Sequence, residues 1–196
     1  MAAHPKHERT FIMVKPDGVQ RGLTGEIIRR IEQVGLKVVG LRMEHTTKAK
    51  VDGHYPKDEK WINRLGEKTM STYMKYGYDA KEELGTTDTM KIGTMVRSWL
   101  LEYMVSAPVV QLVIEGVHAI DMVRKLVGDT IPANAQMGTI RGDYSVDSAA
   151  SANRDKRSIY NLVHASETPE EAEHEIEYWF GKEQTFAYER ADDMLA

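Results

Sequence analysis

In the first 43 residues the predicted elements are joined by very short connections, and these limit the folds that the chain can adopt. Residues 9–15 form an apolar run typical of a β-strand that ends in Lys15, and Pro-Asp-Gly at 16–18 predicts a turn. A helix is expected from Thr24, with isoleucines and a valine at helical spacing, and Gly35 ends it. A second strand, 36–43, follows directly. The sequence therefore predicts a strand–helix–strand unit with short joints.

The remaining elements continue this alternation. Further helices are expected at 49–55, 92–104 and about 119–127, a third strand at 109–115, and a fourth strand at 159–163. The last helix should begin after Thr168 and run to about Phe180, because Thr-Pro-Glu-Glu is a typical helix start. A polar loop is expected at 129–147.

Two polar segments interrupt the pattern, 56–90 and 147–158. We interpret both as insertions. The first would carry short helices of its own and would not be a separate domain, because its apolar content is too small for a core. The second is small and polar, then basic. The chain is then one domain spanning 1–196.

The order β-α-β-β-α-β is that of a ferredoxin-like α+β fold, a four-stranded antiparallel sheet with helices packed on it. Helical connections alone would also permit a doubly wound parallel sheet. The short helix–strand joints and the absence of a Gly-rich first turn count against that alternative.

Composition excludes several classes of function. The chain has no cysteine, which removes disulfides, thiolate nucleophiles and Cys-bound metals and suits a reducing cytosol. The longest apolar run, 109–114, is too short to cross a membrane, and no apolar leader opens the chain. A net charge of -4 argues against a general nucleic-acid binder. We expect a cytoplasmic protein with no membrane partner and no specific nucleic-acid partner.

The predicted elements present one histidine, His164, between the fourth strand and the last helix. The amino end of a helix carries partial positive charge and favours a phosphate. The alternative is a histidine with a structural role in a strand-to-helix loop. Glu175, about two turns into the helix, could bind one imidazole nitrogen and leave the other free as nucleophile. Equally, Glu175 could belong to a solvated acidic helix.

Three cations lie near predicted element ends, namely Lys15, Arg124 and Arg141. Each alone could be a solvated charge, but with a nucleophile they would form a phosphoryl-transfer site that works by positioning and electrostatics. The P-loop, dinucleotide, protein-kinase and zinc-protease motifs are missing. We expect the other histidines to be structural or surface residues: His4, His7, His45, His54, His118 and His174.

Three stretches resemble signatures of the nucleoside diphosphate kinase family and follow one another in the family's order. They are Thr-Phe-Ile-Met-Val-Lys-Pro-Asp-Gly-Val at 10–19, Gly-Thr-Ile-Arg-Gly-Asp at 138–143 and Asn-Leu-Val-His-Ala-Ser at 161–166. The similarity covers about 10–55, 98–146 and 159–180.

The resemblance implies reversible transfer of a γ-phosphoryl group from a nucleoside triphosphate to a nucleoside diphosphate. Transfer would be ping-pong, through a pros-phosphohistidine on His164, with Mg²⁺ carried by the nucleotide phosphates and no metal ligand from the protein. The alternative is a non-catalytic nucleotide-binding ferredoxin-like module. Retention of His164 together with the three cations argues against it, because binding alone does not need the histidine.

The resemblance also implies roles for individual residues. Ser166 and Glu175 would position His164, and Tyr55 would lie beside the transferring group. Nucleotide contacts would come from Lys15, Arg124, Thr130, Arg141 and Asn161, and the position of the base-stacking residue falls on Val96.

Family members are commonly hexamers or tetramers, so we expect a homo-oligomer of one of these sizes. The loop 129–138 would take part in its assembly. For the insertion 56–90 our hypothesis is a lid on the nucleotide side.

Overall fold

The structure is a computed structural model that describes residues 5–181 and 184–191. Its strands are β1 (Glu8–Val14), β2 (Lys37–Glu44), β3 (Val109–Gly116) and β4 (Val163–Ala165). In chain order its helices are η1 (Pro5–His7), α1 (Pro16–Gln20), α2 (Thr24–Gln33), α3 (Lys48–His54), α4 (Glu59–Tyr76), α5 (Ala80–Leu84), α6 (Thr89–Met104), α7 (Ala119–Val127), η2 (Pro132–Asn134), α8 (Ile140–Tyr144), α9 (Ala149–Arg154) and α10 (Pro169–Phe180), where η marks a 3₁₀ helix.

The strands form one sheet in the order β2-β3-β1-β4, and every pairing is antiparallel. β1 pairs with β3 along its whole length, from Glu8 opposite Gly116 to Val14 opposite Val110. This arrangement confirms the predicted ferredoxin-like sheet, and the parallel alternative is wrong. In the described ranges no helix is both long and apolar enough to cross a membrane.

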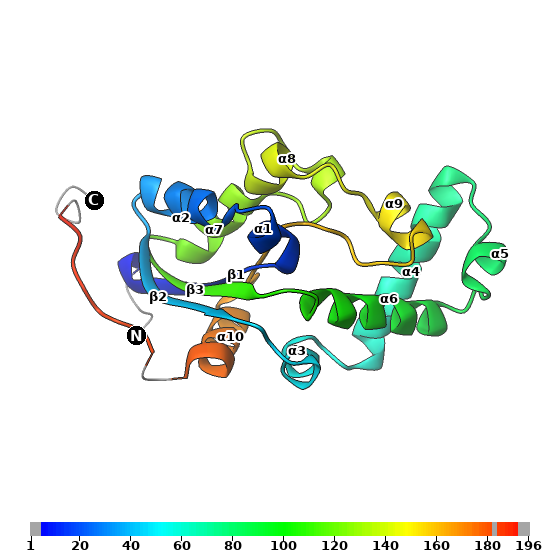
Figure 1. Cartoon of the computed structure of the whole chain (residues 1–196), viewed down its shortest axis with the longest axis horizontal. Coiled ribbons are helices and arrows are strands. Elements are labelled where there is room, and N and C mark those ends of the chain that lie inside the picture. The colour runs from blue at the N-terminus through cyan, green and yellow to red at the C-terminus, as the bar shows by residue number, and fades with distance from the viewer. Residues whose placement is uncertain (1–4, 182–183, 192–196) are drawn as a thin grey trace.

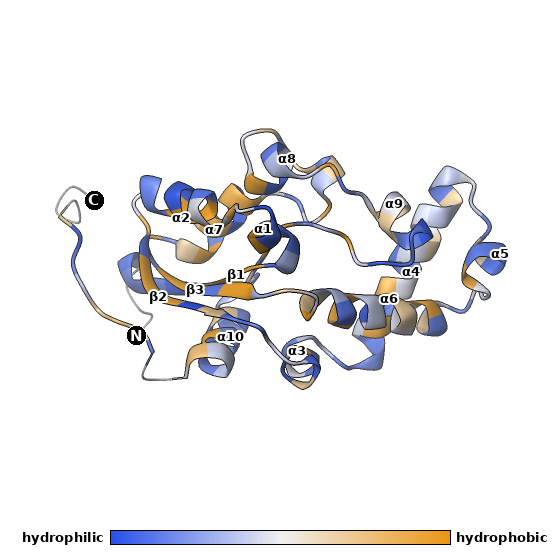
Figure 2. Ribbon diagram, in the orientation of Figure 1, coloured by the Kyte–Doolittle hydropathy of each residue, from blue (hydrophilic) through white to orange (hydrophobic). Residues whose placement is uncertain are grey.

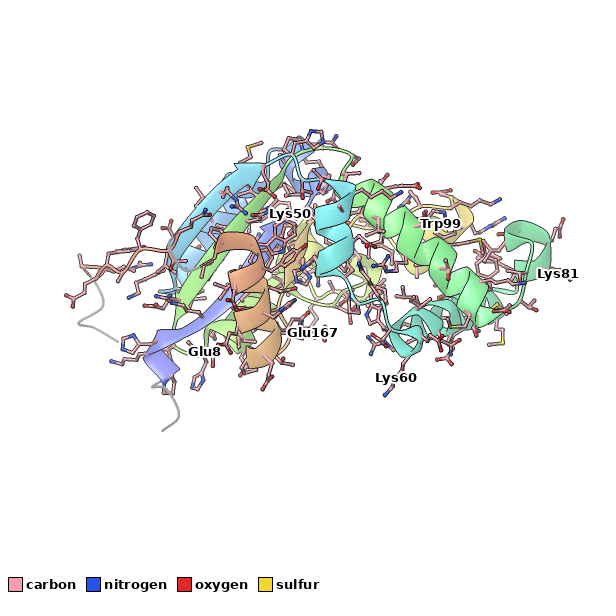
Figure 3. All side chains as sticks on the ribbon, turned by 90° about the horizontal axis from the view of Figure 1, so that it is seen from below. Glu8, Lys50, Lys60, Lys81, Trp99 and Glu167 are labelled. Atoms are coloured by element: carbon pink, nitrogen blue, oxygen red, sulfur yellow. The ribbon has the colours of Figure 1, made fainter. Side chains whose placement is uncertain are left out.

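Helices cover both faces of the sheet, so β1 is buried on both sides. Because side chains alternate along a strand, Ile12 and Val14 pack with α2 and α7, whereas Phe11 and Met13 pack with α3, α6 and α10. Figure 1 shows α2 and α7 on one side of the sheet and α10 on the other, and Figure 2 shows the apolar residues of these helices turned inward. Figure 3 shows α10 lying across the strands.

Three local predictions are wrong. Pro16-Asp17-Gly18 begins the short helix α1 instead of a turn, since Pro16 takes the first helical position. Arg141 lies in helix α8, which the side chain of Thr139 caps, and not in a loop. The fourth strand begins only at Val163, because Leu162 has φ 68° and breaks the extended chain. His164 therefore lies inside β4, paired with Met13.

The segment 56–90 is more helical than expected, since α4 has 18 residues. Its packing on α6 is close: a Cβ on Gly66 would lie 1.8 Å from the Thr89 carbonyl oxygen. α9, from the second polar segment, packs on α4. α4, α5, α6 and α9 form an arm that extends beyond the end of the sheet (Figure 1). That 1–196 is a single domain with two insertions stays a prediction.

Candidate functional site

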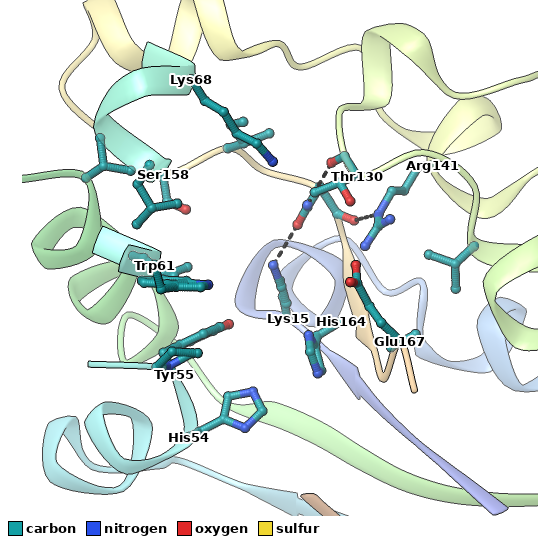
Figure 4. Close-up of a pocket in the computed structure, with 18 of the residues that line it drawn as sticks. Lys15, His54, Tyr55, Trp61, Lys68, Thr130, Arg141, Ser158, His164 and Glu167 are labelled. Carbon is teal, nitrogen blue, oxygen red and sulfur yellow. Dashed lines mark hydrogen bonds between the residues drawn. The ribbon is translucent and has the colours of Figure 1, made fainter. Parts of the chain in front are cut away.

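A cavity of about 470 Å³ lies where the sheet meets the arm. It brings together nine of the ten residues that the sequence singled out: Lys15, Tyr55, Val96, Arg124, Thr130, Arg141, Asn161, His164 and Glu175. The tenth, Ser166, does not line the cavity and contacts Glu175 instead. Residues far apart in the chain therefore converge on one site, and Figure 4 labels Lys15, Tyr55, Thr130, Arg141 and His164 among them.

Glu175 and Ser166 hold His164 through a chain of hydrogen bonds. Its Nε2 lies 2.7 Å from Glu175 Oε1, and Ser166 Oγ donates to Glu175 Oε2 at 2.6 Å. A carboxylate only accepts hydrogen bonds, so His164 Nε2 carries the proton and Nδ1 keeps its lone pair. Burial, followed by the nearby Lys15 ammonium, lowers the pKa of His164. The geometry thus offers a neutral imidazole with Nδ1 as the nucleophilic atom.

Lys15 follows β1 and is buried at the floor of the cavity. Its ammonium donates to Asn161 Oδ1 at 2.7 Å. Burial, and then the charge of Arg141, lowers the pKa of Lys15 from 10.5 to about 7, while Asp17 opposes this shift. Two buried cations close together destabilise one another unless an anion binds between them. The site is therefore electrostatically prepared for an anion.

Arg141 fixes the chain on either side of His164. It donates to the carbonyl oxygens of Asn161 at 3.1 Å, Gly128 at 2.9 Å and Val163 at 2.7 Å. Burial lowers the pKa of Arg141 to about 10, so the guanidinium stays charged at neutral pH. Three of its five N–H groups serve this bracing, and two remain for a ligand.

Arg124 and Thr130 stand at the open end of the cavity, where both are exposed. Arg124 pairs with Glu167 at 3.3 Å, and the Thr130 carbonyl accepts from Asn161 Nδ2 at 2.9 Å. The amino end of α10 offers less than the sequence indicated, because its own side chains engage the amides of Glu167 and Glu171. The cations, not the helix end, are the available anion site.

His54 was expected to be a structural or surface residue, and the structure puts it beside His164. Its ring centroid lies 4.9 Å from that of His164 at an interplanar angle of 87°. Trp179 Nε1 donates to His54 Nδ1 at 3.2 Å, so the proton sits on Nε2, a buried atom without a partner among the described residues. Burial, and then the proximity of His164, lowers the pKa of His54 to about 3. A neutral donor therefore stands next to His164, and its only sequence signal was adjacency to Tyr55.

Tyr55 and the loop before His164 complete the site. The Tyr55 hydroxyl is buried without a partner in the described part of the chain, and burial raises its pKa, so it stays protonated. Asp17 accepts from the Tyr103 hydroxyl and, at 3.2 Å, from the Leu162 amide. The bracing role of Asp17, which lies within the motif at 10–19, was not predicted from the sequence.

A resident Mg²⁺ does not fit the protein side chains. Within the described ranges, one group of three or more possible ligand residues occurs, His54, His164 and Glu175, with ligand atoms all within 4.8 Å of one another. Mg²⁺ prefers oxygen ligands, and two of these three are imidazoles. Oxygen ligands for Mg²⁺ would have to come mainly from a bound molecule.

Comparison with known proteins gives a consistent match. The family model described as nucleoside diphosphate kinase matches residues 8–76 and 88–185. A nucleoside diphosphate kinase of Pyrobaculum aerophilum is 45% identical over 177 residues, which cover 90% of this chain and 97% of that one. One from Archaeoglobus fulgidus is 38% identical over 186 residues, covering 95% of each chain.

Solved structures agree with the sequence matches. The crystal structure of an NDP kinase from Pyrobaculum aerophilum superimposes with a TM-score of 0.89 at 42% identity and covers 92% of this chain and 100% of that one. A nucleoside diphosphate kinase from Borrelia burgdorferi, a transition-state mimic with bound vanadate and ADP, gives a TM-score of 0.76 at 34% identity, covering 95% of each chain.

Proposed function

We propose, because this chain belongs to the nucleoside diphosphate kinase family, that it moves the γ-phosphoryl group between nucleotides through a phosphohistidine on His164. Nucleotide phosphotransfer follows from family membership. The covalent route is our proposal, and one observation carries it: Glu175 holds Nε2 of His164 and leaves Nδ1 free at the cavity.

In the first half-reaction Nδ1 of His164 attacks the γ-phosphorus of a nucleoside triphosphate in line with the bond to the β-phosphate oxygen. The P–N bond forms as that P–O bond breaks, and the nucleoside diphosphate leaves with the bonding electrons. The proton on Nε2 remains there, and its hydrogen bond to Glu175 strengthens as positive charge develops on the ring. In the second half-reaction a β-phosphate oxygen of another diphosphate attacks the phosphorus and restores the free imidazole.

A histidine nucleophile suits this exchange because donor and acceptor anhydrides are nearly equal in energy. The intermediate must also hold its phosphoryl group in a high-energy bond. A phosphoserine ester would be a thermodynamic sink, whereas a phosphoramidate passes the group on in either direction.

The surrounding side chains supply the electrostatics. Lys15 would contact the transferring group and, with Asn161, the ribose, while Arg124, Thr130 and Arg141 would bind the distal phosphates. The Tyr55 hydroxyl and the Nε2–H of His54 are buried donors that a phosphoryl oxygen would satisfy. Mg²⁺ carried by the nucleotide would neutralise charge on the phosphates. A homo-hexamer or tetramer, and a cytoplasmic location, stay predictions.

Incubation with γ-labelled ATP and Mg²⁺, without an acceptor, tests the proposal. We expect label that survives alkali, is lost in acid and is chased into GTP by GDP, and that is missing in His164→Ala. His174→Ala is the matched control, because His174 is an exposed histidine of α10 outside the cavity. An unlabelled wild-type protein would favour the non-catalytic nucleotide-binding module.

A further inference from the structure

The arm end of the cavity is lined by side chains that the phosphoryl transfer does not use. α4 contributes Trp61, Arg64, Leu65 and Lys68, and α9 contributes Asn153. Lys15, Arg141 and His164 line the same cavity from the sheet side, and Figure 4 shows Trp61 across the cavity from Lys15. A nucleotide whose phosphates lie among these cations would extend its base toward the arm.

Trp61 offers an aromatic surface at that end. Its indole is half-buried and lies nearly parallel to the Tyr55 ring, with centroids 6.5 Å apart and an interplanar angle of 26°. The start of α4 holds it in place, because Asp58 accepts from the Trp61 amide at 2.9 Å. A planar base gains most from a flat, preorganised ring. Val96, where the family resemblance would put such a ring, is aliphatic and lines the same cavity from α6.

Asn153 is the second and independent observation. Its side chain lines the cavity, and the residue is only 6% exposed. The amide makes no side-chain hydrogen bond with any described residue and, unlike the Tyr55 hydroxyl, is not fully buried, so a molecule in the cavity can reach it. An amide offers a donor and an acceptor, which is what the polar edge of a nucleobase requires.

The position of Asn153 is fixed by the neighbouring side chains of α9 and its flank. Arg154 pairs with Glu83 at 3.2 Å and lies over the Tyr78 ring at 4.4 Å, which ties α9 to the segment that contains α4. Arg157 pairs with Asp147 at 2.6 Å. Trp61 and Asn153 therefore belong to one arm and not to two independent loops.

We propose that the arm forms a nucleobase site of this chain's own, in which Trp61 stacks on the base and Asn153 binds its edge. The inference rests on the proposed function, because the phosphate position sets where the base lies. The ligand is a purine or pyrimidine nucleoside diphosphate or triphosphate.

Calorimetric binding in a His164→Ala background tests the site without turnover. Mg²⁺ with ADP or GDP is compared with Mg²⁺ and inorganic pyrophosphate, a probe that has no base. We expect Trp61→Ala to raise the Kd of both nucleotides by about 5- to 150-fold, the range that base–aromatic stacking provides, and to leave the pyrophosphate Kd unchanged. Trp61→Leu, which keeps apolar volume without a ring, should behave in the same way. Asn153→Asp should change the ratio of the ADP and GDP Kd values about tenfold, because a carboxylate accepts but does not donate.

Fluorescence provides the matched control, since the chain has three tryptophans. Nucleotide binding should quench the tryptophan fluorescence of Trp99→Phe and not that of Trp61→Phe. Trp99, labelled in Figure 3, lies on α6 outside the cavity lining. Unchanged nucleotide affinity in both Trp61→Ala and Asn153→Ala would overturn the base site. Absence of label on His164, with Trp61-dependent binding intact, would overturn the phosphohistidine route alone.

Discussion

Replacing Glu175 with glutamine keeps the shape of the hydrogen-bond chain behind His164 and removes its charge. His164 Nε2 lies 2.7 Å from Glu175 Oε1 in the structure, and a glutamine amide oxygen at that place can still accept its hydrogen bond. Ser166 can turn its hydroxyl to accept from the new NH₂ group. The substitution therefore separates the electrostatic role of Glu175 from its role in orientation.

The expected loss follows from burial. Glu175 is 3% exposed, so solvent screens its charge weakly. A hydrogen bond to a charged group is worth about 1.5–3 kcal/mol, against about 1 kcal/mol for a neutral pair. The ring gains positive charge only as phosphorus is transferred, so most of this difference falls on the barrier. The difference is about 0.5–2 kcal/mol, so with about 1.4 kcal/mol for each factor of ten, Glu175→Gln should slow phosphorylation of His164 by about 2- to 30-fold.

Rapid-quench measurement of His164 labelling by γ-labelled ATP in a single turnover gives this rate directly. ¹⁵N spectra of labelled histidine report whether the proton of His164 stays on Nε2, a readout that a merely structural role would not move. Glu177→Gln on the exposed side of the same helix is the control and should leave both unchanged. A wild-type labelling rate in Glu175→Gln would refute the reasoning.

Three further predictions concern the residues after β1. Because burial lowers the pKa of Lys15 to about 7, the unfolded chain binds more protons than the folded chain between pH 7 and 10.5, so the free energy of unfolding should rise with pH across that window. Lys15→Met should remove this slope and raise the free energy of unfolding at pH 7 by about 1.4 kcal/mol per unit of pKa shift relieved, as measured by chemical denaturation. The same substitution should abolish phosphoryl transfer in the labelling assay. The same titration predicts that kcat/KM falls as pH rises through about 7, because the free enzyme loses the Lys15 charge, and a flat profile to pH 9 would contradict it. Gly18→Ala should lower the free energy of unfolding by about 1–3 kcal/mol in thermal unfolding, because a Cβ would lie 2.8 Å from Val14 Cγ1 and 2.9 Å from the Leu162 carbonyl oxygen. The control is Gly25→Ala, which has open space around it within α2 and should be neutral or stabilising.

The order of the strands along the chain and most helices could be predicted because local patterns suffice for them. The continuous apolar run of β1, the glycine after α2 and the capping threonine of α10 all act within a few residues. The late start of the fourth strand was missed because a distant contact decides the backbone there. Leu162 adopts φ 68° and gives its amide to Asp17, 145 positions earlier, so the fourth strand starts later than its apolar run indicates.

The sequence by itself determined which side chains can carry the chemistry, because residue type and motif order need no coordinates. It could not determine which imidazole nitrogen of His164 is free, that His54 lies 4.9 Å from that ring, or that Trp61 and Asn153 border the same cavity. These depend on distances between elements that are remote in the chain. Only the packing of α10, α3, α4 and α9 around the end of β1 sets them, since burial and hydrogen-bond partners are properties of the folded chain and not of a local segment.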